Sequence, residues 1–332
     1  MAESPSRSPE NVDAVAAFAR DVAIGLTDTP RWLPCQYLYD ARGSELFEQI
    51  TRLPEYYPTR TEAGILKSAS ARIAELTGDV TVIELGSGNS EKTGRLLSAY
   101  TGAHGTARYV PVDVSEAAIQ QARDRLAEEH SEVQVSPLIG TYEESFPLFG
   151  AHSPSMVVFL GSTIGNFNHG ESLRFWRSIS EHLELGDHFL LGVDLVKDRA
   201  VLEAAYNDSA GVTAEFTKNL FVRMNRELDA GIDVSEVEHV AWYNATWQRI
   251  EIFAHFHAAQ TIRIGPLDME VVIEAGERVM VEISRKFVIE HLTAYLSVFG
   301  FEVRQVFTDE SRWFAVLLLR RTRPLATAAP ER

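Results

Sequence analysis

The feature that most constrains the fold is a glycine turn between an apolar run and a helical pattern. Residues 81–85 are mostly apolar, Gly86-Ser87-Gly88 follows directly, and the pattern of residues 94–100 predicts a helix. Glycine lacks a Cβ, so its backbone allows a ligand to approach closely, and the N–H groups at a helix start point toward that ligand. The stretch therefore predicts a strand, a turn and a helix that together hold a cofactor.

A second apolar run indicates which cofactor suits this turn. Residues 108–114 form this run, and Asp113 is the acid near its end. In an open α/β sheet, an acid at that strand end accepts hydrogen bonds from both ribose hydroxyls of a nucleoside. A dinucleotide fingerprint needs a third glycine three positions after Gly88, where this chain has Glu91. The pattern thus favours S-adenosylmethionine over a dinucleotide.

Strand and helix patterns alternate over the first two thirds of the chain, which predicts an α/β fold with a doubly wound sheet. The pattern breaks after about residue 197 and resumes near the C-terminus with a helix and two strands, which brings the predicted sheet to seven strands. The predicted strands of this sheet are 81–85, 108–114, 133–138, 155–161, 188–193, 301–309 and 312–321, and the predicted helices are 61–76, 115–129, 170–183 and 288–299.

Between the fifth strand and the returning helix, the sequence predicts a second, smaller α+β domain. Helical patterns occupy residues 200–226, and alternating strand patterns occupy 249–264 and 269–283. An insertion at this point suits a substrate-binding domain. The predicted divisions are a disordered N-terminus (1–11), an N-terminal part of the substrate domain (12–60), the core (61–196), the inserted substrate domain (197–286), a return to the core (287–322) and a disordered tail (323–332).

Composition and charge exclude several classes of function. The 332 residues carry 31 Lys and Arg against 47 Asp and Glu, and the resulting net charge of −16 opposes binding to nucleic acid or to an anionic membrane. Cys35 is the only cysteine, so no internal disulfide or thiolate cluster forms, and no apolar stretch is long enough to span a membrane. We expect a cytoplasmic monomer that acts on a small molecule.

Several longer motifs make the chain similar to the L-histidine Nα-methyltransferase family of ergothioneine biosynthesis, a class I S-adenosylmethionine-dependent group. The resemblance covers about residues 21–319. It rests on Tyr-Asp-x-x-Gly-Ser-x-Leu-Phe (39–47), Thr-Arg-Leu-Pro-Glu-Tyr-Tyr-Pro-Thr-Arg-Thr-Glu (51–62), Glu-Leu-Gly-Ser-Gly-x-Ser-Glu-Lys-Thr (84–93), Phe-Leu-Gly-Ser-Thr-Ile-Gly-Asn (159–166), Asp-Leu-Val-Lys-Asp (194–198), Ala-Gly-Val-Thr-Ala-x-Phe (210–216) and Glu-x-Ser-x-Lys-Phe (282–287). It implies a Rossmann-like core that methylates L-histidine three times to give hercynine.

The resemblance also implies which residues bind the methyl donor. Lys92 would lie near the methionine carboxylate and Asp113 on the ribose, and the family holds adenine with an Asp-Phe pair where this chain has Thr141-Tyr142. A carboxylate contact to the adenine amine would therefore be missing, and a backbone carbonyl or the Thr141 hydroxyl would replace it. The full set implied for the cofactor is Gly86, Ser87, Gly88, Lys92, Asp113, Thr141, Tyr142 and Gly161.

For the amino acid substrate, the resemblance implies contacts from several distant segments. Asn166 and Tyr206 would bind the amino and carboxylate groups, and Glu282 and Ser284 would bind the imidazole from one face of a strand. Tyr39 would assist loss of the ammonium proton, with Asn166 as the second catalytic residue. The full set implied for the substrate, which includes the mono- and dimethylated forms of histidine, is Tyr39, Tyr56, Asn166, Tyr206, Ile252, Glu282 and Ser284.

Two alternatives remain open at this point. Ile252 stands where the family usually carries a methionine, and related enzymes methylate tryptophan, so a tryptophan N-methyltransferase is the first. A non-catalytic regulator that binds S-adenosylmethionine is the second. The ten histidines, including His255 and His257, lack a partner set with thiolates, so we expect them to be surface or packing residues and expect no metal.

Overall fold

The computed structural model describes residues 9–87 and 91–325 of the chain. Within it the chain divides into two compact units. Unit 1 consists of Met1–Tyr57 and Lys197–Ser284, and unit 2 of Pro58–Val196 and Arg285–Arg332. These boundaries fall at residues 57, 196 and 284, where the sequence places domain boundaries at 60, 196 and 286.

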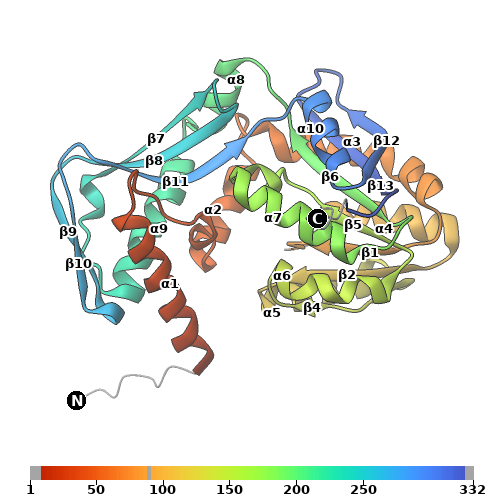
Figure 1. Cartoon of the computed structure of the whole chain (residues 1–332), viewed down its shortest axis with the longest axis horizontal. Helices are drawn as coiled ribbons and strands as arrows, with labels where there is room; N and C mark the ends of the chain where they lie inside the picture. Colours follow the sequence, from red (N-terminus) through yellow and green to blue (C-terminus); the bar gives the residue numbers. More distant parts are fainter. Residues whose placement is uncertain (1–8, 88–90, 326–332) are drawn as a thin grey trace, which may run out of the picture. The chain divides into compact units, whose positions relative to one another are not determined.

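Unit 2 contains a mainly parallel sheet with helices on both faces (Figure 1). Its elements are α3 (Tyr57–Thr77), β1 (Thr81–Leu85), α4 (Glu91–His104), β2 (Ala107–Asp113), α5 (Glu116–Glu129), β3 (Val133–Val135), β4 (Leu138–Ile139), α6 (Tyr142–Ser145), η2 (Phe146–His152), β5 (Ser155–Phe159), η3 (Thr163–Asn166), α7 (His169–His182), β6 (His188–Asp194), α10 (Ile289–Val298), β12 (Phe301–Thr308) and β13 (Phe314–Arg321), where η denotes a 3-10 helix.

The strand order of this sheet is β12-β13-β6-β5-β1-β2-β3, and the short β4 also pairs with β2. Strands β6, β5, β1, β2 and β3 run parallel, whereas β13 is antiparallel to both β6 and β12. The chain therefore crosses over between β1 and β5, so the loops after these strands leave the same edge of the sheet in opposite directions. In open α/β sheets, ligands bind at such a crossover. The predicted doubly wound α/β fold is confirmed, with an eighth strand added by β4.

Alternate residues of the central strands face two separate cores. Ile83 and Leu85 of β1 belong to a core that includes side chains of α7 and α10, whereas Val82 belongs to a core with α3 and α4. Because both faces are covered, β1 and β5 are buried at every position. The polar loops after these strands are therefore held by a rigid base.

Unit 1 combines helices with a three-stranded and a two-stranded antiparallel sheet. Strand order in the larger sheet is β11-β8-β7, and α1 contacts both strands of the β10-β9 pair. The elements are α1 (Pro9–Thr27), η1 (Cys35–Leu38), α2 (Ala41–Thr51), α8 (Arg199–Ala204), α9 (Val212–Leu228), η4 (Val234–Glu236), β7 (Val237–Asn244), β8 (Arg249–Phe256), β9 (Gln260–Ile264), η5 (Gly265–Leu267), β10 (Met269–Ile273) and β11 (Arg278–Arg285).

Charged and aromatic contacts join the N-terminal segments of unit 1 to α9. Asp40 begins α2 by accepting a hydrogen bond from the backbone N–H of Gly43 at 2.8 Å. The same carboxylate accepts from Asn219 and Arg226 of α9, each at 2.7 Å. The Arg226 guanidinium and these hydrogen bonds outweigh burial and lower the pKa of Asp40. The segment before α2 is thus fixed against a helix that is far away in the sequence.

Several predicted element boundaries are wrong, and two of these differences have a local reason in a proline. Helix α1 begins at Pro9, so residues 9–11 are helical and not disordered. Helix α3 begins at Tyr57, four residues before the predicted start, because Pro58 is tolerated in a first helical turn. The predicted tail includes Leu325, which packs against the core. The predicted strand 133–138 is split into β3 and β4, since Pro137 has no N–H to donate.

Candidate active site

The glycine turn lies at the carboxyl end of β1, beside the loop that carries Tyr142. Gly86 has φ +65°, and a Cβ added to it would lie 2.7 Å from the Tyr142 hydroxyl oxygen. The N–H groups of Gly86 and Ser87 both donate to the Val112 carbonyl, at 2.9 and 3.2 Å. The position therefore needs glycine for both its backbone angle and its space. Gly88, also predicted to bind the cofactor, lies outside the described residues.

Asp113 ends the neighbouring strand β2 and anchors the two loops beside it. Its carboxylate accepts from the Ser115 N–H at 3.0 Å, and its carbonyl accepts from the Gly140 N–H at 3.0 Å. Residue 113 also pairs with Ile139 of β4, which brings the following Thr141 to the same edge of the sheet. The structure thus gathers Asp113, Thr141 and Tyr142 around the glycine turn, and their contacts to the cofactor stay predictions.

Thr141 has a structural role that the prediction did not include. Its hydroxyl accepts from the Glu144 N–H at 3.3 Å and lies 3.0 Å from the Glu144 carboxylate, which also accepts from the Thr141 N–H at 2.8 Å. This is a capping box at the start of α6. The Thr141 hydroxyl therefore already has partners within its own helix cap, and its suggested contact to adenine stays a prediction.

A buried ion pair links Lys92 to the end of β5. Glu62 of α3 is 0% exposed, and its carboxylate accepts from Lys92 Nζ at 2.6 Å and from the Gly161 N–H at 2.8 Å. A Cβ on Gly192 of β6 would lie 2.0 Å from the Glu62 carboxylate, so only glycine leaves room for it there. Glu62 thereby positions two residues that the sequence assigns to the cofactor.

A second buried carboxyl group, that of Glu84, lies just before the glycine turn. It accepts hydrogen bonds from the hydroxyls of Thr93 and Tyr109. Burial raises the pKa of Glu84 to about 7, although the two hydroxyls and Lys92 partly oppose this shift. The carboxyl group joins β1, β2 and α4 directly beneath the predicted cofactor loop.

Together these features of unit 2 fit S-adenosylmethionine. The chain turns at Gly86 with φ +65°, an acid ends β2 at Asp113, and the aromatic ring of Tyr142 packs against Phe159 with centroids 5.6 Å apart. A glycine turn after one strand and an acid at the end of its neighbour are the features with which open α/β sheets bind a nucleoside.

Asn166, predicted to bind the substrate, ends the short helix η3 after β5. The preceding Ser162 has φ 57°, and its hydroxyl accepts from the Asp194 N–H at 3.0 Å. Asp194 also pairs with Lys286 at 2.8 Å, and both side chains are almost fully buried. This pair, absent from the predicted site, fixes the loop that carries Asn166.

In unit 1 the predicted substrate residues form a continuous aromatic group. Tyr39 packs against Phe47 and Phe216 with ring centroids 5.4 and 5.3 Å apart. Phe47 lies 6.3 Å from Tyr56, and Tyr56 lies 6.1 Å from Tyr206. Three tyrosines from distant segments are therefore brought together, and their contacts to the substrate stay predictions.

Tyr206 is held at both its hydroxyl and its backbone. The hydroxyl shares a hydrogen bond of 2.8 Å with Ser284 of β11, and the Tyr206 carbonyl accepts from His239 Nε2 at 2.8 Å. Burial lowers the pKa of His239, so the ring is neutral, and its Nδ1 then accepts from the Thr217 hydroxyl at 2.8 Å. This arrangement fixes the histidine tautomer and, through it, the position of Tyr206.

Tyr39 and Glu282 influence each other electrostatically. Burial of its hydroxyl, and then the negative charge of Glu282, raise the pKa of Tyr39 well above 10, although 39% of the residue is exposed. Tyr39 therefore keeps its proton at neutral pH, so its hydroxyl can donate or accept a hydrogen bond but is not a phenolate base. Glu282 is half-buried on β11, and Ile252 is 2% exposed on β8.

Sequence reasoning missed Glu62, His239 and Lys286 as supporting residues. Glu62 and Lys286 lie within motifs that carry the resemblance, which was the signal available, whereas His239 had none. Each of the three pairs with a residue at least 22 positions away, so the pairing depends on the fold.

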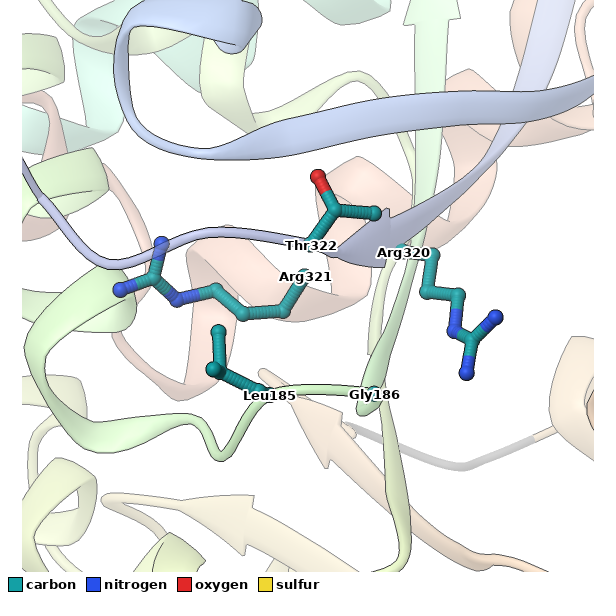
Figure 2. A pocket seen from close by; sticks show the side chains of 5 residues that line it. All are labelled: Leu185, Gly186, Arg320, Arg321 and Thr322. Carbon is teal, nitrogen blue, oxygen red and sulfur yellow. The ribbon is translucent and has the colours of Figure 1, made fainter.

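One surface hollow of about 320 Å³ lies elsewhere in unit 2 (Figure 2). It is lined by Leu185, Gly186, Arg320, Arg321 and Thr322. These residues flank the start of β6 and the end of β13, the opposite ends of these strands from Asp194. The hollow is therefore separate from the candidate site.

Within the described residues, no helix is both long and apolar enough to cross a membrane.

The chain resembles known proteins over most of its length. It matches the family described as "Histidine-specific methyltransferase, SAM-dependent" over residues 18–321. It is 43% identical to a histidine N-alpha-methyltransferase of Mycolicibacterium smegmatis, over 92% of this chain and 95% of that protein. It is 42% identical to a protein of the same name from Mycobacterium tuberculosis, over 91% and 94%, and 25% identical to an L-tryptophan methyltransferase of Psilocybe serbica, over 94% and 95%. The chain therefore belongs to the family of S-adenosylmethionine-dependent, histidine-specific methyltransferases.

Proposed function

We propose that this protein transfers methyl groups from S-adenosylmethionine to the α-amine of L-histidine. Three successive transfers give hercynine, the trimethylated betaine, as the first step of ergothioneine biosynthesis. The observation that carries the proposal is the 43% identity to a histidine N-alpha-methyltransferase over nearly the full length of both chains. Two relatives named ergothioneine biosynthesis protein 1, from Neurospora crassa and Schizosaccharomyces pombe, support the place in the pathway.

On the donor side, the bound S-adenosylmethionine supplies a methyl group on a positively charged sulfur. Asp113 would bind the ribose and Tyr142 would pack on the adenine. The backbone of Gly86 and Ser87 would lie close to the ligand. Lys92 already donates one hydrogen to Glu62, and because an ammonium group has three, it would bind the methionine carboxylate with another. The proposed work of these residues is positioning, which is the main requirement of an in-line methyl transfer.

On the acceptor side, the α-amine must lose its proton before it can react. Asn166 and Tyr206 would bind the amino acid head group, and Tyr56 would border the ring. Tyr39 keeps its own proton, so it would accept a hydrogen bond from the ammonium group and direct the released proton to water. The Ser284 hydroxyl is hydrogen-bonded to the Tyr206 hydroxyl. The residue that would bind the imidazole ring is thus connected to a residue that would bind the head group.

Glu282 favours histidine over tryptophan as the substrate. A carboxylate that accepts from the imidazole N–H is satisfied by histidine, whereas beside an indole it would be poorly paired. The likeness to a tryptophan methyltransferase, at 25% identity, keeps tryptophan as the competing substrate to be tested.

The test is to compare kcat/KM for histidine and tryptophan with the same enzyme. We expect histidine to be the better substrate, and a higher kcat/KM for tryptophan would refute the proposal. Replacing Glu282 by Ala should lower kcat/KM for histidine by about 10- to 100-fold, the cost of one charged hydrogen bond. Glu282→Gln, which keeps an acceptor, should lose less. If both variants match the wild type, the role of Glu282 is wrong although the activity stands.

We also propose that the enzyme acts as a monomer in the cytoplasm and does not bind nucleic acid. The net charge of −16 supports the last point because it repels phosphates. Light scattering after size-exclusion chromatography would test the monomer, and a mass of about twice 37.0 kDa would contradict it.

A further inference from the structure

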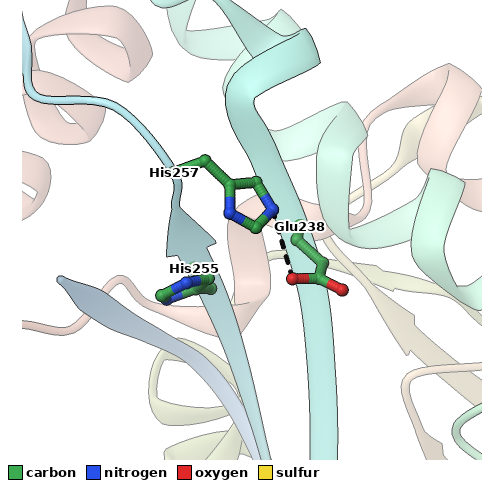
Figure 3. Close-up of side chains that lie close together, drawn as sticks. All are labelled: Glu238, His255 and His257. Atoms are coloured by element: carbon green, nitrogen blue, oxygen red, sulfur yellow. Dashed lines mark ion pairs between the residues drawn. The ribbon is translucent and has the colours of Figure 1, made fainter. Parts of the chain in front are cut away.

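Three side chains that could bind a metal ion lie together on the three-stranded sheet of unit 1 (Figure 3). They are Glu238 of β7, His255 of β8 and His257 just after β8. One ligand atom from each lies within 4.8 Å of the other two. The sequence-based expectation treated both histidines as surface or packing residues and predicted no metal.

The backbone explains why these side chains converge. Glu238 pairs directly with His255 in the antiparallel ladder of β7 and β8, so their side chains leave the same face. His257 follows His255 by two positions, which places it on that face as well, and its N–H donates to the Glu236 carbonyl at 2.9 Å. Two of the three residues therefore lie on paired strands, and the third follows β8 directly and is held by a backbone hydrogen bond.

Their chemistry also fits a metal ion. His257 Nε2 lies 3.2 Å from a Glu238 carboxylate oxygen, and the two histidine rings are nearly perpendicular with centroids 4.9 Å apart. Within the described part of the chain, Nδ1 of His255 is buried and has no hydrogen-bond partner. The cluster thus holds one ring nitrogen that the protein leaves unsatisfied and one histidine–carboxylate pair in which a metal ion could replace the shared proton.

We propose that Glu238, His255 and His257 form a binding site for one zinc-like divalent ion. Two imidazoles and one carboxylate suit Zn²⁺, Co²⁺ or Ni²⁺, whereas Mg²⁺ and Ca²⁺ prefer sites built from oxygen ligands. Glu238 and His257 are about half exposed, so water completes the tetrahedral shell. The ion joins β7 to the end of β8 and stabilises unit 1, independently of methyl transfer.

The test is calorimetric titration of the tag-free full-length protein with Zn²⁺ in buffer without histidine, because affinity tags and the free amino acid both bind zinc. We expect one ion per chain. His257→Ala and Glu238→Gln should each weaken binding at least tenfold, since changes even beyond the ligands cost about 10- to 100-fold in affinity. His291→Ala, which removes an exposed histidine on α10, is the matched control and should bind as the wild type does.

Thermal unfolding gives a second readout that does not depend on activity. Zn²⁺ at about 100 times the Kd of the wild type should raise the Tm of the wild type and of His291→Ala by about 5 °C, and should raise that of His257→Ala by no more than about half as much, the shift left after a tenfold loss of affinity. Absence of binding to the wild type, or equal affinity in all four proteins, overturns the proposal. Because both replaced side chains are largely exposed, we expect the variants to fold.

Discussion

The buried carboxyl group of Glu84 predicts a pH dependence of stability that can be measured directly. Glu84 is 6% exposed, and its pKa is raised by burial from 4.5 to about 7. Between these values the folded chain carries a proton that the unfolded chain has released. The folded state therefore binds more protons in this range, and linkage requires its stability to fall as the pH rises through it.

The magnitude follows from the width of that range. About 2.5 pH units at about 1.4 kcal/mol each make the folded state about 3 kcal/mol less stable above pH 7 than below pH 4.5, from this group alone. Glu84→Gln removes the titration. Its amide accepts from one of the Thr93 and Tyr109 hydroxyls and donates to the other, as the protonated acid does.

The assay is urea unfolding of both proteins between about pH 5 and about pH 8. The free energy of unfolding of the wild type relative to Glu84→Gln should fall by about 2.5 kcal/mol across this range, because part of the full change already lies below pH 5. His188, whose pKa burial lowers to about 4, titrates in both proteins and cancels in the difference. Glu75→Gln, an exposed control, should follow the wild type. Parallel profiles for the wild type and Glu84→Gln would refute a protonated carboxyl group at this position.

Three further variants test the candidate site. Gly86→Ala should weaken S-adenosylmethionine binding at least about tenfold, since the positive φ of residue 86 and the nearby Tyr142 hydroxyl both disfavour a Cβ. An unchanged affinity, measured by calorimetry, would contradict this. Glu62→Gln should also weaken the binding of S-adenosylmethionine, because it removes the negative charge that positions Lys92. The affinity for histidine should stay the same, and loss of affinity for both the donor and histidine would instead indicate general unfolding. Tyr206→Phe breaks the hydrogen bond to Ser284 and should raise the KM for histidine about tenfold. The affinity for the donor should be unchanged, and an unaltered KM would exclude a contact between the Tyr206 hydroxyl and the substrate.

The architecture of unit 2 could be predicted because its signals are local and periodic. Apolar runs fully buried on both faces mark the parallel strands, and the turn at Gly86 separates the first strand from its helix. Unit 1 was predicted less well. Strand β7 was missed because its sequence, Val-Glu-His-Val-Ala-Trp-Tyr-Asn, carries polar residues without a clear alternation. The predicted strand 269–283 is interrupted before β11, where Gly276 has φ +83° in a turn.

The candidate site shows the same limit. Gly86 and Asp113 could be assigned from spacing, since each lies at the end of a recognisable strand. The cap at Thr141 was also visible as Thr-x-x-Glu before a short helix, and reading it would have shown that the hydroxyl is used locally. The pairing of Glu62 with Lys92 was not visible, because it joins two helices whose contact only the fold defines.

In the proposed reaction the α-amine of histidine receives three methyl groups from S-adenosylmethionine. Mass spectrometry of the product formed from L-histidine and a donor with an isotope-labelled methyl group tests donor, acceptor and number of transfers together. We expect one dominant product, histidine that carries three labelled methyl groups on its α-nitrogen. Unmodified histidine after full incubation, or methyl groups on the imidazole ring, would contradict it.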